Sequence, residues 1–490
     1  MIQNIKKTWY YFKRNGLAAA VAKASEQISQ QSSERGYQVW LAKHLPTPEQ
    51  LKIQRQYKFT NPITFSIIVP TYRTNPVFLR QMVDSVLDQT YPQLELCIAD
   101  GSPDDSVSDI LKEYRDSRIR YQRLAENKGI SGNTNAAFAM ANGDYIALLD
   151  HDDILTPDAL YEMAAAVEAD PTIDMLYSDE DKVSADLKQY FNPHFKPDFN
   201  PELLRTNNYI CHFLVVKKDL AACAGHFRPE YDGAQDYDFI FRCSEQARNI
   251  YHIPKILYHW RSHIDSTAAN PQSKLYAYEA GKRALESHLQ RMQKQNNSGK
   301  PSDQNKSKDI NLKTEVSHTS HLGFYRVQYI PLSGSHTEQC YMHIRDAKSL
   351  KPQIRTEIQQ ELTANCMRPE VGIVGGKTLY PDGRVFQAGL RRTKEGTYEP
   401  EFQGLKKRYS GYMHRADLQR CADSVSFDCF AVKRELLKQL GISPQDLKTQ
   451  EDINRLCGKI KAAGYLVIFT PYACIRMKHS GMIHDEMEHI

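Results

Sequence analysis

Short apolar runs alternate with amphipathic stretches between residues 63 and 150, and this rhythm predicts alternating strands and helices. Residues 66–69 are a β-branched run that stops at Pro70, as expected of a buried strand. Residues 76–89 then place apolar side chains at helical spacing. The pattern continues as a strand at 94–99, a helix at 104–116, a strand at 119–121, a helix at 130–141 and a strand at 145–149.

Repeated strand–helix units of this length predict an α/β fold with a Rossmann-like, mostly parallel sheet and helices on both faces. In such sheets ligands bind beyond the carboxyl ends of the strands. Three polar segments, 70–72, 100–102 and 150–153, directly follow predicted strands. We therefore expect them to converge on one edge of the sheet.

The chain has 490 residues, which is too long for one ordinary core, so more than one domain is expected. Residues 293–317 contain no aromatic residue and are rich in polar residues, which is typical of a solvated, flexible linker. The predicted organisation is a helical N-terminal extension at 1–62, a catalytic domain at 63–292, the linker at 293–317 and a second domain at 318–490.

The composition, 41% hydrophobic and 25% charged, is that of a soluble globular protein. A net charge of +4 gives no reason to expect nucleic acid as a partner. The ten cysteines form no C-x-x-C pair, and dispersed cysteines in a long chain predict a reduced, cytosolic protein. No apolar stretch approaches the roughly 18 residues of a membrane span.

Residues 1–25 are basic and aromatic, with five Lys or Arg side chains and no acidic one. One interpretation is a helix lying on the inner, anionic face of a membrane. The other is a helix packed on the neighbouring domain, and the sequence does not decide between them. It also leaves open whether the chain forms a homo-oligomer.

Asp150 and Asp152 are a carboxylate pair spaced by one residue, directly after a buried strand. Mg²⁺ and Mn²⁺ prefer oxygen ligands and bridge diphosphates, so a metal held here could neutralise a departing nucleoside diphosphate. The alternative is an Asp-rich turn that caps the helix beginning near Thr156. Asp100 likewise suits either a contact to a base or ribose or an ordinary Asp-Gly turn.

Asp236 and Asp238 open a predicted helix, and because they are two residues apart they cannot share one of its faces. At most one can act in a given site as a general base, and the alternative is that both favour the positive end of the helix dipole. His259 follows another strand and suits a metal ligand or a phosphate contact, although a single histidine is more often structural.

Together these residues resemble the inverting family 2 glycosyltransferases with the GT-A fold. The resemblance covers residues 55–270. Its pieces Ser-Asp-Glu-Asp-Lys at 178–182 and Phe-Lys-Pro-Asp at 195–198 resemble a subgroup of rhamnosyltransferase-like enzymes that build bacterial surface polysaccharides. The matching motifs are Ser-Ile-Ile-Val-Pro-Thr-Tyr at 66–72, Asp-Gly-Ser at 100–102, Glu-Asn-Lys-Gly-Ile-Ser-Gly at 126–132, Leu-Asp-His-Asp-Asp at 149–153, Gly-Ala-Gln-Asp-Tyr-Asp at 233–238, Tyr-His-Trp-Arg at 258–261, Tyr-Ser-Asp-Glu-Asp-Lys at 177–182 and Phe-Lys-Pro-Asp-Phe at 195–199.

The resemblance implies a metal-dependent enzyme that transfers a sugar from a nucleotide-sugar donor to a glycan or lipid-linked acceptor, with inversion. It assigns Asp236 as the catalytic base, and Lys196 with the acids at 179–181 to the acceptor side. The expected ligands of Mn²⁺ or Mg²⁺ are Asp150, Asp152 and His259. The nucleotide-sugar contacts are expected at Pro70, Thr71, Tyr72, Asp100, Gly132, Asn133 and Asp150.

Residues 318–490 resemble the later part of a second such domain, through 371–383 and 464–473. The loop that would bind a nucleoside is missing, and the metal motif is reduced to Ile344-Arg345-Asp346. We therefore expect a degenerate lobe, with Asp452 at the position of the base. Two alternatives to a glycosyltransferase remain for the whole chain: a nucleotidyltransferase, or a scaffold that binds nucleotide sugar or glycan without turnover.

Overall fold

The computed structural model describes residues 36–263, 275–297, 312–332, 336–406 and 408–478. The chain divides into two compact units. The first comprises Met1–Phe199, Asn208–Arg291 and Ser320–Gly323, and the second comprises Asn200–Asn207, Met292–Thr319 and Phe324–Ile490.

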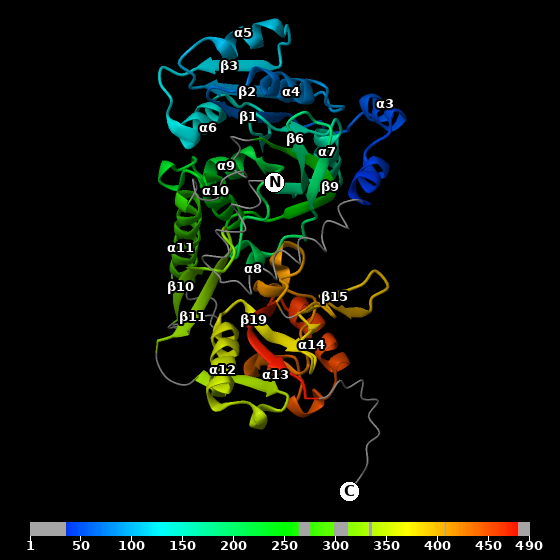
Figure 1. Ribbon diagram of the computed structural model, residues 1–490, viewed down its shortest axis with the longest axis vertical. Coiled ribbons are helices and arrows are strands. Elements are labelled where there is room, and N and C mark those ends of the chain that lie inside the picture. Colours follow the sequence, from blue (N-terminus) through cyan, green and yellow to red (C-terminus); the bar gives the residue numbers. More distant parts are fainter. Residues whose placement is uncertain (1–35, 264–274, 298–311, 333–335, 407, 479–490) are drawn as a thin grey trace. The chain divides into compact units, whose positions relative to one another are not determined.

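Within the described residues of the first unit, nine strands form one sheet in the order β3-β2-β1-β4-β8-β6-β9-β5, with β7 on β6. Figure 1 shows β1, β2 and β3 beside α4, α5 and α6. The strands are β1 (Phe65–Thr71), β2 (Leu94–Asp100), β3 (Ile119–Arg123), β4 (Tyr145–Leu148), β5 (Ile154–Leu155), β6 (Met175–Ser184), β7 (Tyr190–His194), β8 (Leu214–Lys217) and β9 (Ile250–Ser262).

The helices of the first unit follow the predicted alternation. For example, α4 begins at Pro76, whose missing N–H costs nothing at the first helical position, and the side chain of Asn75 caps it. The helices are 36–44, α3 (Pro48–Gln56), α4 (Pro76–Leu87), α5 (Ser106–Glu113), α6 (Gly129–Met140), α7 (Ala159–Ala169), α9 (Lys218–Ala224), α10 (Gln235–Ser244) and α11 (Leu275–Asn297).

The predicted α/β fold is confirmed. Strands β3, β2, β1 and β4 run parallel, as does the pair β6–β9. Strand β8 is antiparallel to both of its neighbours, β4 and β6, and joins the two parallel parts.

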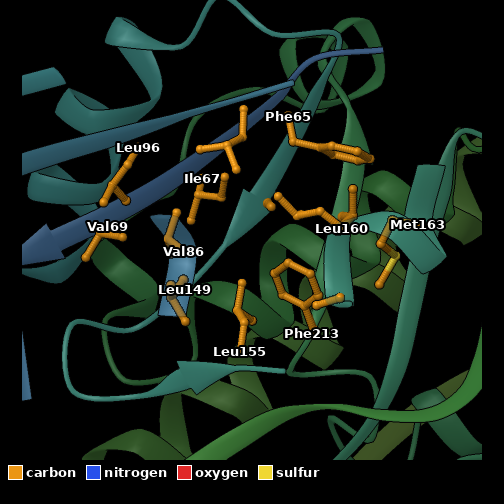
Figure 2. Packing of buried hydrophobic residues seen from close by; sticks show 14 of the residues in the cluster. Phe65, Ile67, Val69, Val86, Leu96, Leu149, Leu155, Leu160, Met163 and Phe213 are labelled. Carbon is orange, nitrogen blue, oxygen red and sulfur yellow. The ribbon is translucent and has the colours of Figure 1, made fainter. Parts of the chain in front are cut away.

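Alternate residues of the central strands build the main core. Phe65, Ile67 and Val69 of β1 share one cluster with side chains of α4, α5 and α7, as Figure 2 shows for Val86, Leu160 and Met163. Helix α6 contacts β1 and β2 but contributes nothing to this cluster. The pattern of period two therefore places helices on both faces.

The second unit has a separate sheet with strand order β12-β18-β13-β19-β17, and β14 pairs with β13. Helix α12 packs in one core cluster, and α13 and α14 pack in another. Its elements are α8 (Pro201–Leu204), β10 (Leu312–His318), β11 (Tyr325–Pro331), β12 (Cys340–Ile344), α12 (Pro352–Met367), β13 (Val371–Leu379), β14 (Val385–Gln387), β15 (Leu390–Arg392), β16 (Tyr398–Pro400), β17 (Arg420–Cys421), β18 (Cys429–Lys433), α13 (Arg434–Gln439), α14 (Gln450–Ala462) and β19 (Leu466–Arg476).

Some sequence expectations fall on residues outside the description. The proposed membrane contact of residues 1–25 is one of them. Of the predicted linker, residues 293–297 end α11 and residues 312–317 lie in β10. None of the helices in the described ranges combines the length and apolar character needed to cross a membrane.

Candidate active site

The carboxyl ends of β1, β2 and β4 lie at one edge of the first unit's sheet. Strand β1 pairs in parallel with β2, placing Thr71 opposite Asp100, and with β4, placing Ile68 opposite Leu148. Pro70 is buried inside β1. Because these strands run in the same direction, the segments that follow them leave the sheet side by side.

Asp100 is fully buried, and both of its carboxylate oxygens accept hydrogen bonds. Oδ1 accepts from the Thr71 hydroxyl at 3.1 Å and the Ser102 backbone N–H at 2.9 Å, and Oδ2 accepts from the Tyr121 hydroxyl at 3.0 Å. Burial and the charge of Asp100 raise the pKa of Tyr121, so that the phenol stays a donor. Tyr72 is 41% exposed, so its ring is the open part of this edge.

Asn133 ties the loop before α6 to this edge. Its Oδ1 accepts from the backbone N–H of Lys128 at 3.1 Å, and its Nδ2 donates to Oδ1 of Asn127 at 3.0 Å. A side chain at Gly101 would meet these groups, since an added Cβ would lie 2.9 Å from Asn133 Nδ2. A Cβ at Gly132 would lie 2.4 Å from Cβ of Lys128. Gly101 thus lets this loop approach the end of β2 closely, and Gly132 leaves room for Lys128 within the loop itself.

The acidic loop after β4 contains three carboxylates in different environments. Asp153 is fully buried and accepts hydrogen bonds from the Tyr258 hydroxyl and, at 2.7 Å, from the Arg261 backbone N–H. Burial and the charges of its acidic neighbours raise its pKa. Asp152 lies 2.8 Å from Nε2 of His263 and is 20% exposed. Asp153 therefore holds the loop, while Asp152 remains partly open.

Asp150 is the most open of the three, with 44% of its side chain exposed. Nε2 of His212 lies 3.8 Å from its Oδ2, and the His212 ring stacks on Tyr258 with centroids 4.5 Å apart. Loss of water around Asp150 raises its pKa, and so do the charges of Asp152 and Asp236, whereas His212 lowers it. The carboxylates are thus close enough to repel one another.

These groups fit a divalent cation. One ligand atom each from Asp150, Asp153 and His212 lie within 4.8 Å of one another. The predicted ligand Asp152 is not a member of this group, and it forms a neighbouring pair with His263. Mutual repulsion among acids is relieved by a cation, and Mn²⁺ or Mg²⁺ suits carboxylate oxygens.

His259 is not a member of that group of described residues. Its Nδ1 is bonded to Oδ1 of Asp181 at 2.5 Å, and its ring packs edge-on against Tyr190. The histidines near the acidic loop are His212 and His263, which sequence reasoning did not select. For His263 a signal existed, since it lies four residues beyond His259 and just past the end of the same strand.

Asp236 lies in the first turn of α10 and is partly exposed. Its Oδ2 accepts a hydrogen bond from Nδ2 of Asn208 at 2.7 Å and one from the Cys211 thiol at 3.5 Å. No hydrogen bond from a described residue reaches Oδ1. One oxygen is thus fixed while the other can accept a proton.

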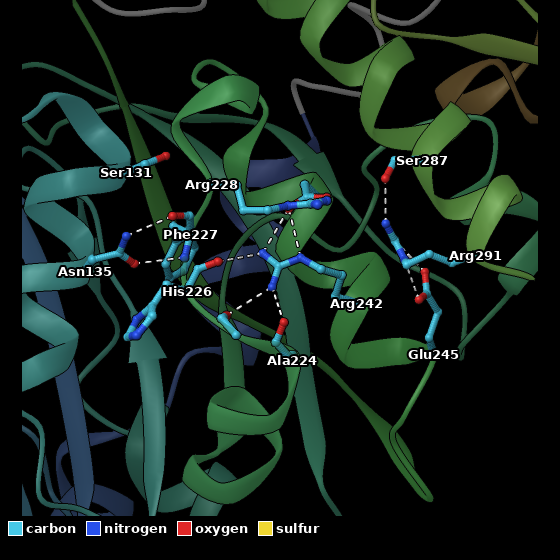
Figure 3. A network of polar contacts seen from close by, with 12 residues as sticks. Ser131, Asn135, Ala224, His226, Phe227, Arg228, Arg242, Glu245, Ser287 and Arg291 are labelled. Carbon is cyan, nitrogen blue, oxygen red and sulfur yellow. Dashed lines mark hydrogen bonds and ion pairs between the residues drawn. The ribbon is translucent and has the colours of Figure 1, made fainter.

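Asp238, two residues on, has a different environment. It is fully buried, and its carboxylate pairs with Arg228 and with Arg242, the latter at 2.9 Å. Figure 3 shows Arg242 reaching on to backbone oxygens of residues 224–226. The structure thus separates the two aspartates, with Asp236 open and Asp238 in a buried ion pair.

The acids at 179–181 also form buried pairs rather than an open surface. They alternate along β6, and each has a basic partner. The pairs are Asp179 with His252 at 2.8 Å, Glu180 with Lys196 at 3.3 Å, and Asp181 with His259 at 2.5 Å.

In the second unit, Asp452 is engaged in local structure. Its Oδ2 accepts from the backbone N–H and hydroxyl of Thr449, which closes a capping box at the start of α14. Its Oδ1 pairs with Arg455. The carboxylate at the predicted position of a second base is thus occupied by a helix cap and an ion pair.

Comparison with known proteins finds a family match mostly within the first unit. Residues 66–223 match the sequence model of glycosyl transferase family 2. This part of the chain is therefore similar to the family 2 glycosyl transferases. Asp236, His259 and His263 lie beyond the matched residues.

Three curated proteins illustrate the similarity of this chain to known sequences. An uncharacterised protein of Sinorhizobium fredii is 32% identical over 483 residues, covering 83% of this chain and 52% of that protein. The O-antigen biosynthesis protein RfbC of Myxococcus xanthus is 35% identical, covering 52% of this chain and 20% of its own. Chondroitin synthase of Pasteurella multocida is 33% identical, and the similarity covers 41% of this chain and 21% of that protein. The chain thus spans about half or less of the length of these relatives.

Among solved structures, Staphylococcus aureus TarS residues 1–349 in complex with UDP-GlcNAc is 19% identical, with a TM-score of 0.36. The similarity covers 49% of this chain and 77% of that one.

Proposed function

We propose that this chain is a metal-dependent, inverting glycosyltransferase that moves a sugar from a nucleoside-diphosphate sugar to a hydroxyl group. The acceptor would be a surface polysaccharide or a lipid-linked glycan precursor, a class supported by relatives named for O-antigen and chondroitin synthesis. The observation that carries the proposal is that one short segment contacts both acids: Asn208 and Cys211 bind Asp236, and His212 lies 3.8 Å from Asp150.

In this proposal each group has a distinct task. Asp236 removes the proton from the acceptor hydroxyl, and the resulting oxygen attacks the anomeric carbon from the face opposite the diphosphate. The new carbon–oxygen bond forms as the bond to the diphosphate breaks, so configuration inverts. Asp150 and Asp152, with His212 and His263, would hold a divalent cation, which supplies positive charge where the diphosphate departs.

The donor would lie along the edge formed by β1 and β2. The open ring of Tyr72 suits stacking on a base. Asp100, fixed by Thr71 and Tyr121, offers a carboxylate that can share a hydrogen bond with a ribose hydroxyl. Gly132 and Asn133 would shape the same pocket by holding the loop before α6 against it.

The test is a panel of nucleotide sugars with Mn²⁺ or Mg²⁺ and a lipid-linked or oligosaccharide acceptor, reading release of nucleoside diphosphate. Wild type should release it from one donor, a chelator should stop the release, and Asp152→Ala should abolish it. Asp109→Ala is the matched control, since Asp109 is exposed on α5 and forms an ion pair with the exposed Lys112. The anomeric configuration of the product, read by NMR, tests inversion.

The alternatives give different results in the same assay. A nucleotidyltransferase would consume a nucleoside triphosphate and release pyrophosphate. A scaffold would bind nucleotide sugar, measured by calorimetry, with no release under any condition. Either result would overturn the proposed function.

A further inference from the structure

Residues 208–213 form a short segment that enters β8 and reaches two parts of the candidate site. From its start, Asn208 donates from Nδ2 to Oδ2 of Asp236 at 2.7 Å. Near its end, His212 places Nε2 3.8 Å from Oδ2 of Asp150. One segment thus contacts both the proposed base and the acidic loop.

A buried lysine binds the backbone of this segment. The side chain of Lys196 is fully buried, and its ammonium group donates to the backbone oxygen of Ile210 at 2.7 Å and to that of His212. Its third partner is Oε2 of Glu180, at 3.3 Å. An ammonium group has three N–H donors, so all three are used, and two of them fix the backbone of the segment.

Other contacts restrict the segment further. Tyr209 and Ile210 are buried, and the Tyr209 ring packs edge-on against Tyr177 with centroids 6.0 Å apart. The backbone N–H of Lys196 donates to Oδ1 of Asp179 at 2.8 Å, which fixes the lysine itself. Asn208 therefore stands on a rigid support rather than on a loose loop.

We propose that Asn208 is a positioning residue that fixes Oδ2 of Asp236, so that Oδ1 takes the proton of the acceptor hydroxyl, and that Lys196 holds Asn208 in place. The inference rests on the proposed function and adds to it the orientation of the base. It also gives a role to Lys196, and to Asp179 and Glu180 of β6, which bind it.

The physical reason is the freedom of a carboxylate. Rotation about χ2 of aspartate is broad, so a lone Asp236 would sample many orientations relative to the acceptor. A hydrogen bond to one oxygen restricts that rotation. Because a misplacement of about 1 Å can cost about 100-fold in rate, loss of Asn208 should lower kcat by about 10- to 100-fold.

The main test is Asn208→Ala in the full chain, measured with the donor and acceptor that wild type uses. We expect the loss in kcat while the donor dissociation constant stays within about twofold of wild type, because the residue contacts the base and not the donor edge. Asn208→Asp, of nearly the same shape, replaces the amide donor with a like charge and should be at least as slow. Asn142→Ala, at an exposed position, is the matched control.

A double variant separates positioning from a general structural effect. In an Asp236→Ala background, where no carboxylate remains to orient, adding Asn208→Ala should change the residual transfer rate by less than about twofold. An equal fold-loss in both backgrounds would overturn the inference. So would a wild-type kcat in Asn208→Ala, or a kcat loss matched by loss of donor affinity and of folded protein.

These results are distinct from failure of the proposed function. If wild type transfers sugar and Asn208→Ala does so equally well, the function stands and the inference is wrong. If wild type transfers no sugar from any donor, both are wrong.

Discussion

Two aspartates in the first turn of α10 should respond in opposite ways to the same substitution. Asp238→Asn keeps the shape of the side chain but removes the charge that faces Arg228 and Arg242. Arg242 is only 8% exposed, so its guanidinium group would lose its counter-charge inside the protein. Asp236→Asn makes the same chemical change at a partly exposed position with no arginine partner in the described residues.

The expected loss of stability in Asp238→Asn follows from the burial of its ion pair with Arg242. Removing one partner of a buried ion pair costs about 3–5 kcal/mol of stability. The pair with Arg228 is 32% exposed on the arginine side and contributes little, about 1 kcal/mol or less. Arg242 keeps hydrogen bonds to backbone oxygens of residues 224–226, which lowers the cost. We therefore expect Asp238→Asn to lose about 3 kcal/mol, the lower end of the range.

The assay is urea unfolding of both variants and wild type, combined with the transfer rate per folded molecule. Asp238→Asn should be less stable yet transfer sugar normally once folded. Asp236→Asn should change stability by less than about 1 kcal/mol and abolish transfer. If Asp238→Asn unfolds like wild type, or if it loses transfer while Asp236→Asn keeps it, the assignment of roles is refuted.

Other predictions concern neighbouring groups. His263→Ala should raise the Mn²⁺ concentration needed for half-maximal transfer. His259→Ala, which leaves the buried Asp181 with the Tyr37 hydroxyl but without its histidine, should mainly lower the melting temperature. Burial alone would raise the pKa of Glu180, but the charge of Lys196 and the hydrogen bond with His194 lower it from 4.5 to about 2. The ionised Glu180 carboxylate should thus contribute about 3 kcal/mol to the stability of the fold above pH 4.5, and this contribution should be lost as pH falls towards 2. Glu180→Gln should flatten that part of a stability-versus-pH curve. Gly101→Ala should weaken donor binding, since the new Cβ meets Asn133 Nδ2 at 2.9 Å, and calorimetry with the donor would measure the change.

The sequence predicted those features that depend on local pattern. Apolar periodicity located β1, β2 and β4. The parallel arrangement then implied that Thr71, Asp100 and the acidic loop share an edge, and the strand register places Thr71 opposite Asp100 and Ile68 opposite Leu148. The choice between Asp236 and Asp238 stayed open because helical spacing excludes a shared face but does not say which face is buried. Burial and the arginine partners of Asp238 supply that information.

Features that depend on distant pairing were not accessible in this way. Asn208 lies 28 residues before Asp236, and His212 lies 62 residues after Asp150, so no local period links them. His259 was chosen as a metal ligand because it follows a strand. A histidine on a strand can face either side, and here Asp181 on the adjacent parallel strand β6 binds Nδ1 of His259. Ligation of a metal through Nε2 of His259 stays a prediction.

The buried pairs of β6 show why such partners matter for function. Replacing a buried ion pair with apolar side chains of similar volume is often neutral or even stabilising, so stability alone gives little reason for Glu180 and Lys196. What apolar side chains would lack is the ammonium group that binds two backbone oxygens of residues 208–213. The ion pair thus holds the Lys196 ammonium group in the interior, where its other two hydrogen bonds fix the segment that contacts Asp236. If this reasoning is right, Lys196→Met with Glu180→Gln should fold yet transfer slowly, with unchanged donor affinity.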